Sequence, residues 1–176
     1  KLRVPLKIKI FLWYLRKGVI LIKDNLAKRG WVGNTTGCFC NSSETIQHLF
    51  FDCHLARFVW NALFITFGIQ PPTNVASLLG NWPYGVHPRL RAHFLIGVAA
   101  LCWAMWLCRN DVVFNGSKAN SFVQVIFRGT FWALEWSLLL KEEEGQHVKD
   151  GCKKLETTML DFFSKFGWNQ RRRLEA

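Results

Sequence analysis

Paired acidic residues are what this sequence lacks. Only 12 of its 176 residues are Asp or Glu, and no two Asp residues are adjacent. Phosphoryl-transfer chemistry on two metal ions needs several carboxylates that converge on one place. The acids here are scattered, apart from Glu142–Glu144, and neither a Gly-rich phosphate loop nor a Gly-x-Ser-x-Gly turn occurs. We therefore predict that the chain is not an enzyme.

Long apolar runs are also missing. The longest, 94–108, has 15 residues, whereas a membrane-spanning helix needs about 18 to 20. We predict a buried core helix there and no membrane partner, although a membrane-associated helical protein stays open as an alternative. The opening has no signal-peptide pattern, and because it starts at Lys1 we expect a fragment or a processed product. Six Cys without such a signal favour thiols or metal ligands over disulfides, and they favour an intracellular location.

Basic residues are abundant instead, and they are unevenly placed. The net charge is +11, and residues 1–31 hold nine Lys or Arg against Asp24 alone. A surplus of this size attracts polyanions such as nucleic acid. The first thirty residues are therefore the expected polyanion-binding surface.

Apolar spacing predicts a mainly α fold. Ile8, Phe11, Leu12 and Leu15 follow Pro5 at helical spacing, and Gly18 ends that pattern. A short helix is expected over 23–29 and another around 55–63, with turns in 34–43. Beyond the loop 68–88, which has four of the five Pro, helices are expected over 90–109, 121–141 with Ser121 as N-cap, and 151–166. We predict a first domain over 1–68 with a small zinc-knuckle turn between helices, a linker over 69–89, and a C-terminal helical bundle or hairpin over 90–176.

One cluster has the residue types of a metal site, Cys38-x-Cys40-x7-His48-x4-Cys53. Three thiols and an imidazole could close a tetrahedral zinc site. The single residue between Cys38 and Cys40 is shorter than the usual spacing of two to four, so the turn would have to bend sharply. The alternative is a set of buried thiols beside a core histidine. Spacing alone leaves both open.

The residues around this cluster are familiar. Three motifs run through residues 5–60: Pro5-x-Lys7-x-Lys9-x-Phe11-x-Trp13, then Leu26-x-x-Arg29-Gly30, then Glu44-Thr45-x-x-His48-Leu49-Phe50-x-x-Cys53 with Ala56 and Trp60. Together they resemble the zinc-binding domain that follows the reverse transcriptase in plant LINE-type (non-LTR) retrotransposon polyproteins. Segment 101–116, with Arg109-Asn110-Asp111, resembles the Trp-rich Arg-Asn-Asp segment after that domain, and segment 122–144 resembles the segment that follows it. The resemblance implies a non-catalytic end of such a polyprotein, with its upstream reverse transcriptase domain as a partner.

One position departs from the family pattern. Where the family has the first Cys of Cys-x-x-Cys, this chain has Gly37. Cys40, His48 and Cys53 carry over directly, and Cys38 completes a Zn²⁺ site only if the turn shifts by one residue. The alternative function is therefore a metal-free helical interaction fragment of a decayed element, without activity. Self-association through exposed apolar surface stays open in either case.

The basic N-terminus supplies the candidate nucleic-acid contacts. Lys and Arg beside Trp13 can join phosphate neutralisation to base stacking, and no motif of a sequence-specific binder is present. We expect non-specific RNA or DNA binding. The alternative is that Trp13 belongs to the core and the Lys and Arg side chains form only a solvated helix face. The candidate residues are Lys7, Lys9, Trp13, Arg16, Lys17, Lys28 and Arg29.

The remaining Cys, His and Trp carry no predicted chemistry. Cys102 and Cys108 lie on the most apolar helix and are expected in the core. His93 and His147 lie beside predicted helices with no Cys at metal spacing, and Cys152 has no neighbour of its kind in the sequence. The tryptophans at 103, 106, 132 and 136 are also predicted to be core.

Overall fold

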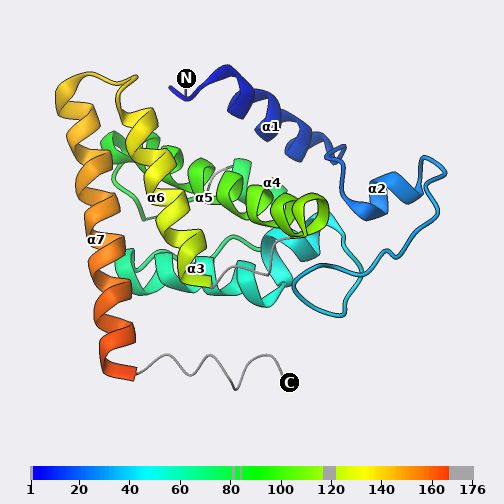
Figure 1. Ribbon diagram of the computed structural model, residues 1–176. Coiled ribbons are helices and arrows are strands. Elements are labelled where there is room, and N and C mark those ends of the chain that lie inside the picture. The colour runs from blue at the N-terminus through cyan, green and yellow to red at the C-terminus, as the bar shows by residue number, and fades with distance from the viewer. Residues whose placement is uncertain (1, 81, 84, 117–121, 167–176) are drawn as a thin grey trace.

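The computed structural model describes residues 2–80, 82–83, 85–116 and 122–166, and within these ranges it contains helices and no strand, which confirms the mainly α fold (Figure 1). The elements in chain order are α1 (Leu6–Lys17), α2 (Lys23–Ala27), the π-helix η1 (His48–Asp52), α3 (His54–Phe67), α4 (Val75–Leu79), α5 (Pro88–Asn115), α6 (Phe122–Ser137) and α7 (Glu142–Phe166).

Helix α1 begins and ends where its sequence predicts. It starts after Pro5 and stops at Gly18, whose φ of 71° is the left-handed conformation that a glycine adopts without strain. Its buried face is Ile8, Phe11 and Leu15, three members of the predicted apolar stripe. The following helix, α2, is shorter than the predicted 23–29.

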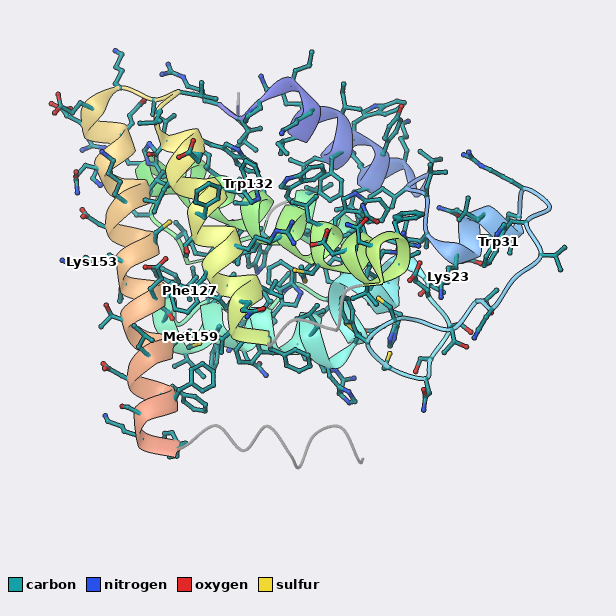
Figure 2. The ribbon with its side chains drawn as sticks, viewed as in Figure 1. Lys23, Trp31, Phe127, Trp132, Lys153 and Met159 are labelled. Carbon is teal, nitrogen blue, oxygen red and sulfur yellow. The ribbon has the colours of Figure 1, made fainter. Side chains whose placement is uncertain are left out.

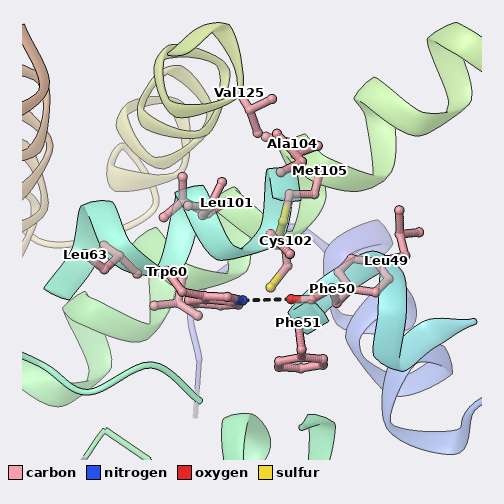
Figure 3. Packing of buried hydrophobic residues seen from close by; sticks show 14 of the residues in the cluster. Leu49, Phe50, Phe51, Trp60, Leu63, Leu101, Cys102, Ala104, Met105 and Val125 are labelled. Atoms are coloured by element: carbon pink, nitrogen blue, oxygen red, sulfur yellow. Dashed lines mark hydrogen bonds between the residues drawn. The ribbon is translucent and has the colours of Figure 1, made fainter. Parts of the chain in front are cut away.

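The middle of the chain is organised around Trp60. Its indole Nε1 donates a hydrogen bond of 2.7 Å to the carbonyl of Phe50 in η1, as the dashed line in Figure 3 shows. A π-helix shifts the usual hydrogen-bond register, so some of its carbonyls need other donors. Trp60 on α3 supplies one of these donors and fixes α3 against η1, with Cys102 and Met105 of α5 close by.

Helices α5, α6 and α7 pack against one another, and α7 also packs along α3 (Figure 1). Gly129 on α6 allows the close approach to α5, because a Cβ there would lie 2.5 Å from Leu101 Cδ2. Cys102 and Cys108 are buried, as predicted, and Trp136 is 2% exposed. Trp103, Trp106 and Trp132 are only partly buried against the core.

Element boundaries also differ from prediction further along the chain. A short helix, α4, lies within the predicted loop 68–88, with a capping box formed by Asn74 and Ser77. Helix α5 extends to Asn115, and α7 starts at Glu142 rather than at Gly151. The three glutamates of its first turn favour the positive end of the helix dipole, and this outweighs the two internal glycines. Ser121, the predicted N-cap of α6, lies outside the described residues.

The larger of two buried apolar clusters joins residues from both ends of the chain, for example Phe11 and Leu15 of α1 with Leu101 and Met105 of α5. By length and composition, α5 is long and apolar enough to cross a membrane, and here 44% of its most apolar window is buried inside the protein. The chain segments before and after the proline-rich loop therefore share one core.

Candidate metal centre and nucleic-acid interface

A tight turn places Cys38 and Cys40. Thr36 and Ser43 form an isolated antiparallel bridge, and the Gly37 N–H donates to the Ser42 carbonyl over 2.7 Å. The turn closes on itself because its residues are small and polar. Its two cysteines are half-buried.

His48 and Cys53 come from the two ends of η1. The backbone N–H of Cys53 donates to the His48 carbonyl over 2.8 Å, which brings the two residues onto one turn of helix. Cys53 is also the N-cap of α3, because its Sγ accepts a 3.3 Å hydrogen bond from the Ala56 N–H. Backbone groups of η1 and of α3 therefore both hold Cys53 in place.

All four candidate ligands face one small space. Cys38, Cys40, His48 and Cys53 line a cavity of about 10 Å³, together with Glu44 and Leu49. This is about the space that one water molecule or one ion requires. The four predicted residues therefore line one small cavity.

One pair of these groups is in direct contact. Cys40 Sγ and His48 Nε2 are 2.7 Å apart, whereas two such ligands on one zinc ion stand roughly 3.5 Å apart. Among the described residues, no three His, Cys, Asp or Glu side chains are arranged to hold a metal ion. Thiolate and imidazole nevertheless fit zinc in donor type. An ion here would require Cys40 and His48 to separate by somewhat less than 1 Å.

Burial raises the thiol pKa values in this cluster. The pKa of Cys38 is raised to about 12, first by burial and then by the nearby Glu44 carboxylate. The pKa of Cys53 is raised to about 11, chiefly by burial. Without a cation the thiols of Cys38 and Cys53 are therefore protonated at neutral pH, and a metal ion would have to displace their protons.

Gly37 adjoins the cluster. A Cβ built at this position would lie 3.7 Å from Cys40 Sγ, and its closest other neighbour would be the Ser42 carbonyl oxygen at 3.3 Å. A side chain at position 37 would therefore start beside Cys40, where the family pattern has a cysteine.

Glu44 and Arg109 form an ion pair that sequence reasoning missed. Their side chains are each 1% exposed, and Glu44 Oε1 accepts from Arg109 Nη2 at 2.5 Å and Nε at 3.1 Å. The same oxygen accepts from the Lys23 N–H over 2.9 Å. Glu44 belongs to the quoted family motif and Arg109 to the segment 101–116, but nothing in the sequence pairs positions so far apart.

Four of the seven candidate nucleic-acid residues share the outer face of α1. Lys9, Trp13, Arg16 and Lys17 are spaced i, i+4, i+7 and i+8, which places them within about 100° around the helix. All four are exposed, and Trp13 is 54% exposed with its ring 5.3 Å from that of Tyr14. An aromatic pair among three cations can stack bases while the cations contact phosphates.

The other three candidates are placed differently. The Lys7 ammonium lies over the Trp132 ring at 5.2 Å and the Trp103 ring at 6.0 Å, facing α5 and α6. Lys28 pairs with Asp24 at 2.8 Å, and Arg29 is exposed beyond the end of α2. Lys7 therefore lies apart from the face that carries Trp13.

Comparison with known proteins identifies the first third of the chain. Residues 1–60 match the family described as zinc-binding in reverse transcriptase. No curated protein and no solved structure matches the chain. The match includes every candidate zinc ligand and every candidate nucleic-acid residue, and it ends within α3. Residues 1–60 are thus similar to the zinc-binding family of reverse transcriptases.

Proposed function

We propose that this chain is a zinc-stabilised module that binds RNA or DNA without sequence preference and assists a polymerase with its template or target. The observation that carries the proposal is the convergence of Cys38, Cys40, His48 and Cys53 on one ion-sized cavity. The family of residues 1–60 supports zinc as the ion.

Zinc would join two separate pieces of backbone. Cys38 and Cys40 belong to the turn after α2, whereas His48 and Cys53 belong to η1 and the start of α3. Four bonds to one ion would fix the turn against the helices, and the energy of binding would become folding energy. The ion's role here is structural, because four protein ligands leave no open position for a substrate.

The outer face of α1 would hold the nucleic acid. Lys9, Arg16 and Lys17 can neutralise phosphates, and Trp13 offers a ring to a base, a contact worth roughly 1–3 kcal/mol. These groups recognise features that every nucleotide has, so the binding would be non-specific.

We also propose that the chain comes from the end of a plant LINE-type polyprotein or a gene derived from one, with the reverse transcriptase as its neighbour. Two residues of the downstream Arg-Asn-Asp motif support this proposal. Arg109 pairs with Glu44 of the zinc-binding domain, and Asp111 accepts from Arg128 on α6. The motif therefore connects the family domain to the helices that follow it.

Zinc content tests the first half of the proposal. The full chain, purified without chelator, should hold about one zinc per molecule, and Cys53→Ala should lose it. Cys152→Ala is the matched control, because Cys152 is a buried thiol that bonds to the Thr130 carbonyl in another part of the fold. Folded wild-type protein without zinc would overturn the metal site.

Salt-dependent binding tests the second half. We expect affinity for single-stranded RNA or DNA to fall with salt, and the triple variant Lys9→Gln, Arg16→Gln, Lys17→Gln to reduce the slope of log K against log salt by about 2–3. The control removes three exposed cations from α7, with Lys149→Gln, Lys153→Gln and Lys165→Gln. Equal losses in the two triples would show that only net charge matters and would reject the α1 face.

A second candidate function rests on the Cys40–His48 hydrogen bond. A thiol and an imidazole in direct contact can hydrogen-bond to each other without an ion. In that case the chain is a metal-free helical interaction fragment, and exposed apolar side chains such as Leu6 and Ile10 of α1 are its contact surface. The zinc measurement decides between the two functions.

A further inference from the structure

A second cavity lies between α3, α5, α6 and α7, away from the candidate metal centre. Its volume is about 450 Å³, within the range of small-molecule sites, about 300–1,000 Å³. We infer that this cavity binds a small amphiphilic carboxylate, with an apolar body and an anionic head, of which a medium-chain fatty acid is the simplest example.

The floor of the cavity is apolar. It is formed by buried side chains from four helices, among them Leu63, Val98, Leu101, Ala133 and Leu155. Its two polar residues are already engaged, because the Thr130 hydroxyl contacts the Glu156 carboxylate and the Cys152 thiol contacts the Thr130 carbonyl. A ligand body that reaches this floor gains by being apolar and finds no free hydrogen-bonding group there.

Two glycines keep the cavity open. Gly97 on α5 and Gly151 on α7 both line it, and a Cβ at either position would meet no atom within 4 Å. Glycine inside a helix costs about 0.5–1 kcal/mol relative to alanine, and close helix packing explains neither of these two. Gly129 differs, because Leu101 leaves no room for a Cβ there. The space in front of Gly97 and Gly151 is the cavity itself.

The rim of the cavity offers more donors than acceptors. Its exposed polar residues are His87, His147, Asp150 and Lys154. The Nδ1 of His87 accepts from the Arg89 N–H over 3.3 Å, which leaves its Nε2–H as a donor. Asp150 already accepts from Gln146 over 2.8 Å, and the Lys154 ammonium lies 5.3 Å from the ring of Phe67, another residue of the wall. Such a rim is complementary to an anion.

His93 is a half-buried polar residue of the cavity wall. Its ring lies 5.3 Å from that of His147, and its buried Nδ1 has no hydrogen-bond partner among the described residues. A buried polar atom without a partner costs about 1–3 kcal/mol. A carboxylate at the rim can accept from Lys154, and it would reach the covered Nδ1 of His93 only after a turn of that ring, which would remove this cost.

The test is a calorimetric titration of the full chain with dodecanoate. Dodecanol serves as the uncharged probe of equal chain length. We expect saturable binding of one dodecanoate per chain and at least tenfold weaker binding of dodecanol. Absence of saturable binding would overturn the inference. Equal affinity for the two probes would overturn the anionic head.

Cavity-filling variants locate the binding. Gly97→Leu and Gly151→Leu fill open space and replace glycine by a better helix former, so we expect both to remain folded by circular dichroism and to weaken dodecanoate binding at least tenfold. Lys154→Gln should weaken dodecanoate several-fold and leave dodecanol unchanged. The matched control is Lys153→Gln, because Lys153 points away from the helices (Figure 2). Undiminished binding in both leucine variants would place the fatty acid elsewhere and reject the cavity.

Discussion

Glu44 and Arg109 lie 65 positions apart in the sequence and form a buried ion pair between the turn of the candidate metal centre and helix α5. The Arg109 guanidinium also lies over the Trp106 and Phe114 rings, at 5.3 Å and 5.6 Å. Glu44 lines the same cavity as the four candidate ligands. The geometry of the turn therefore depends on a helix that lies outside the matched family domain.

Removing one partner of this pair should destabilise the whole fold. We expect Arg109→Met to lower the free energy of unfolding by about 3–5 kcal/mol, because it leaves the Glu44 carboxylate buried and unpaired. The double variant Glu44→Met, Arg109→Met should lose less than Arg109→Met alone, since no charge remains buried. Urea denaturation measures both values, and a double variant at least as unstable as the single one would contradict this account.

Restoring the family cysteine should strengthen zinc binding. In Gly37→Cys the new Cβ starts 3.7 Å from Cys40 Sγ and 3.3 Å from the Ser42 carbonyl oxygen, so a fourth thiolate can reach the cavity after only a slight shift of the turn. We expect at least a tenfold increase in zinc affinity, measured by competition with a chromophoric chelator. Asn41→Cys adds a thiol to the exposed side of the same turn as the control. An equal gain in both variants would show that added thiols act non-specifically.

Variants of Lys7 and Lys9 should separate an effect on folding stability from an effect on nucleic-acid binding. Lys7→Gln removes the cation that lies over Trp103 and Trp132, and we expect a loss of about 0.5–1 kcal/mol of unfolding free energy. Lys9→Gln should leave stability unchanged and reduce the salt dependence of nucleic-acid binding. Thermal unfolding and a salt titration of nucleic-acid binding measure both effects on both variants. If Lys7→Gln lowered the salt dependence and Lys9→Gln lowered the stability instead, Lys7 would belong to the binding face.

Buried thiols should make the metal-free protein sensitive to alkali. Burial raises the pKa of Cys102 to about 12 from an ordinary value of 9.0. The folded state therefore holds this proton at a pH where the unfolded state has lost it, so stability is complete below about pH 9 and falls as the pH rises toward 12. The slope is about 1.4 kcal/mol per pH unit for one such group.

Cys102→Ala isolates that contribution. The variant should be less stable at pH 7 because it leaves a small cavity, but its loss of stability between pH 9 and pH 11 should be smaller than that of the wild type. Urea denaturation at several pH values compares the two slopes. Identical slopes would mean that Cys102 does not titrate with unfolding.

Local patterns in the sequence determined the elements. The stripe that ends at Gly18 defines α1, and the apolar run 94–108 lies inside α5, because helical periodicity and glycine caps act over a few residues. The same local signals brought together the ligand set of Cys38, Cys40, His48 and Cys53 and the basic face around Trp13. They failed at the start of α7, where the charged first turn carries a helix through two glycines.

Only the tertiary structure decided which distant residues meet. It paired Glu44 with Arg109, placed Lys7 over two tryptophan rings of α5 and α6, and put His93 beside His147 at a cavity between four helices. No periodicity encodes such pairs, because they arise when whole helices pack and bury their charged or polar groups together. The sequence determined the helices and the candidate ligands, while helix packing decided what surrounds them, since contacts between distant segments form only once the core has closed.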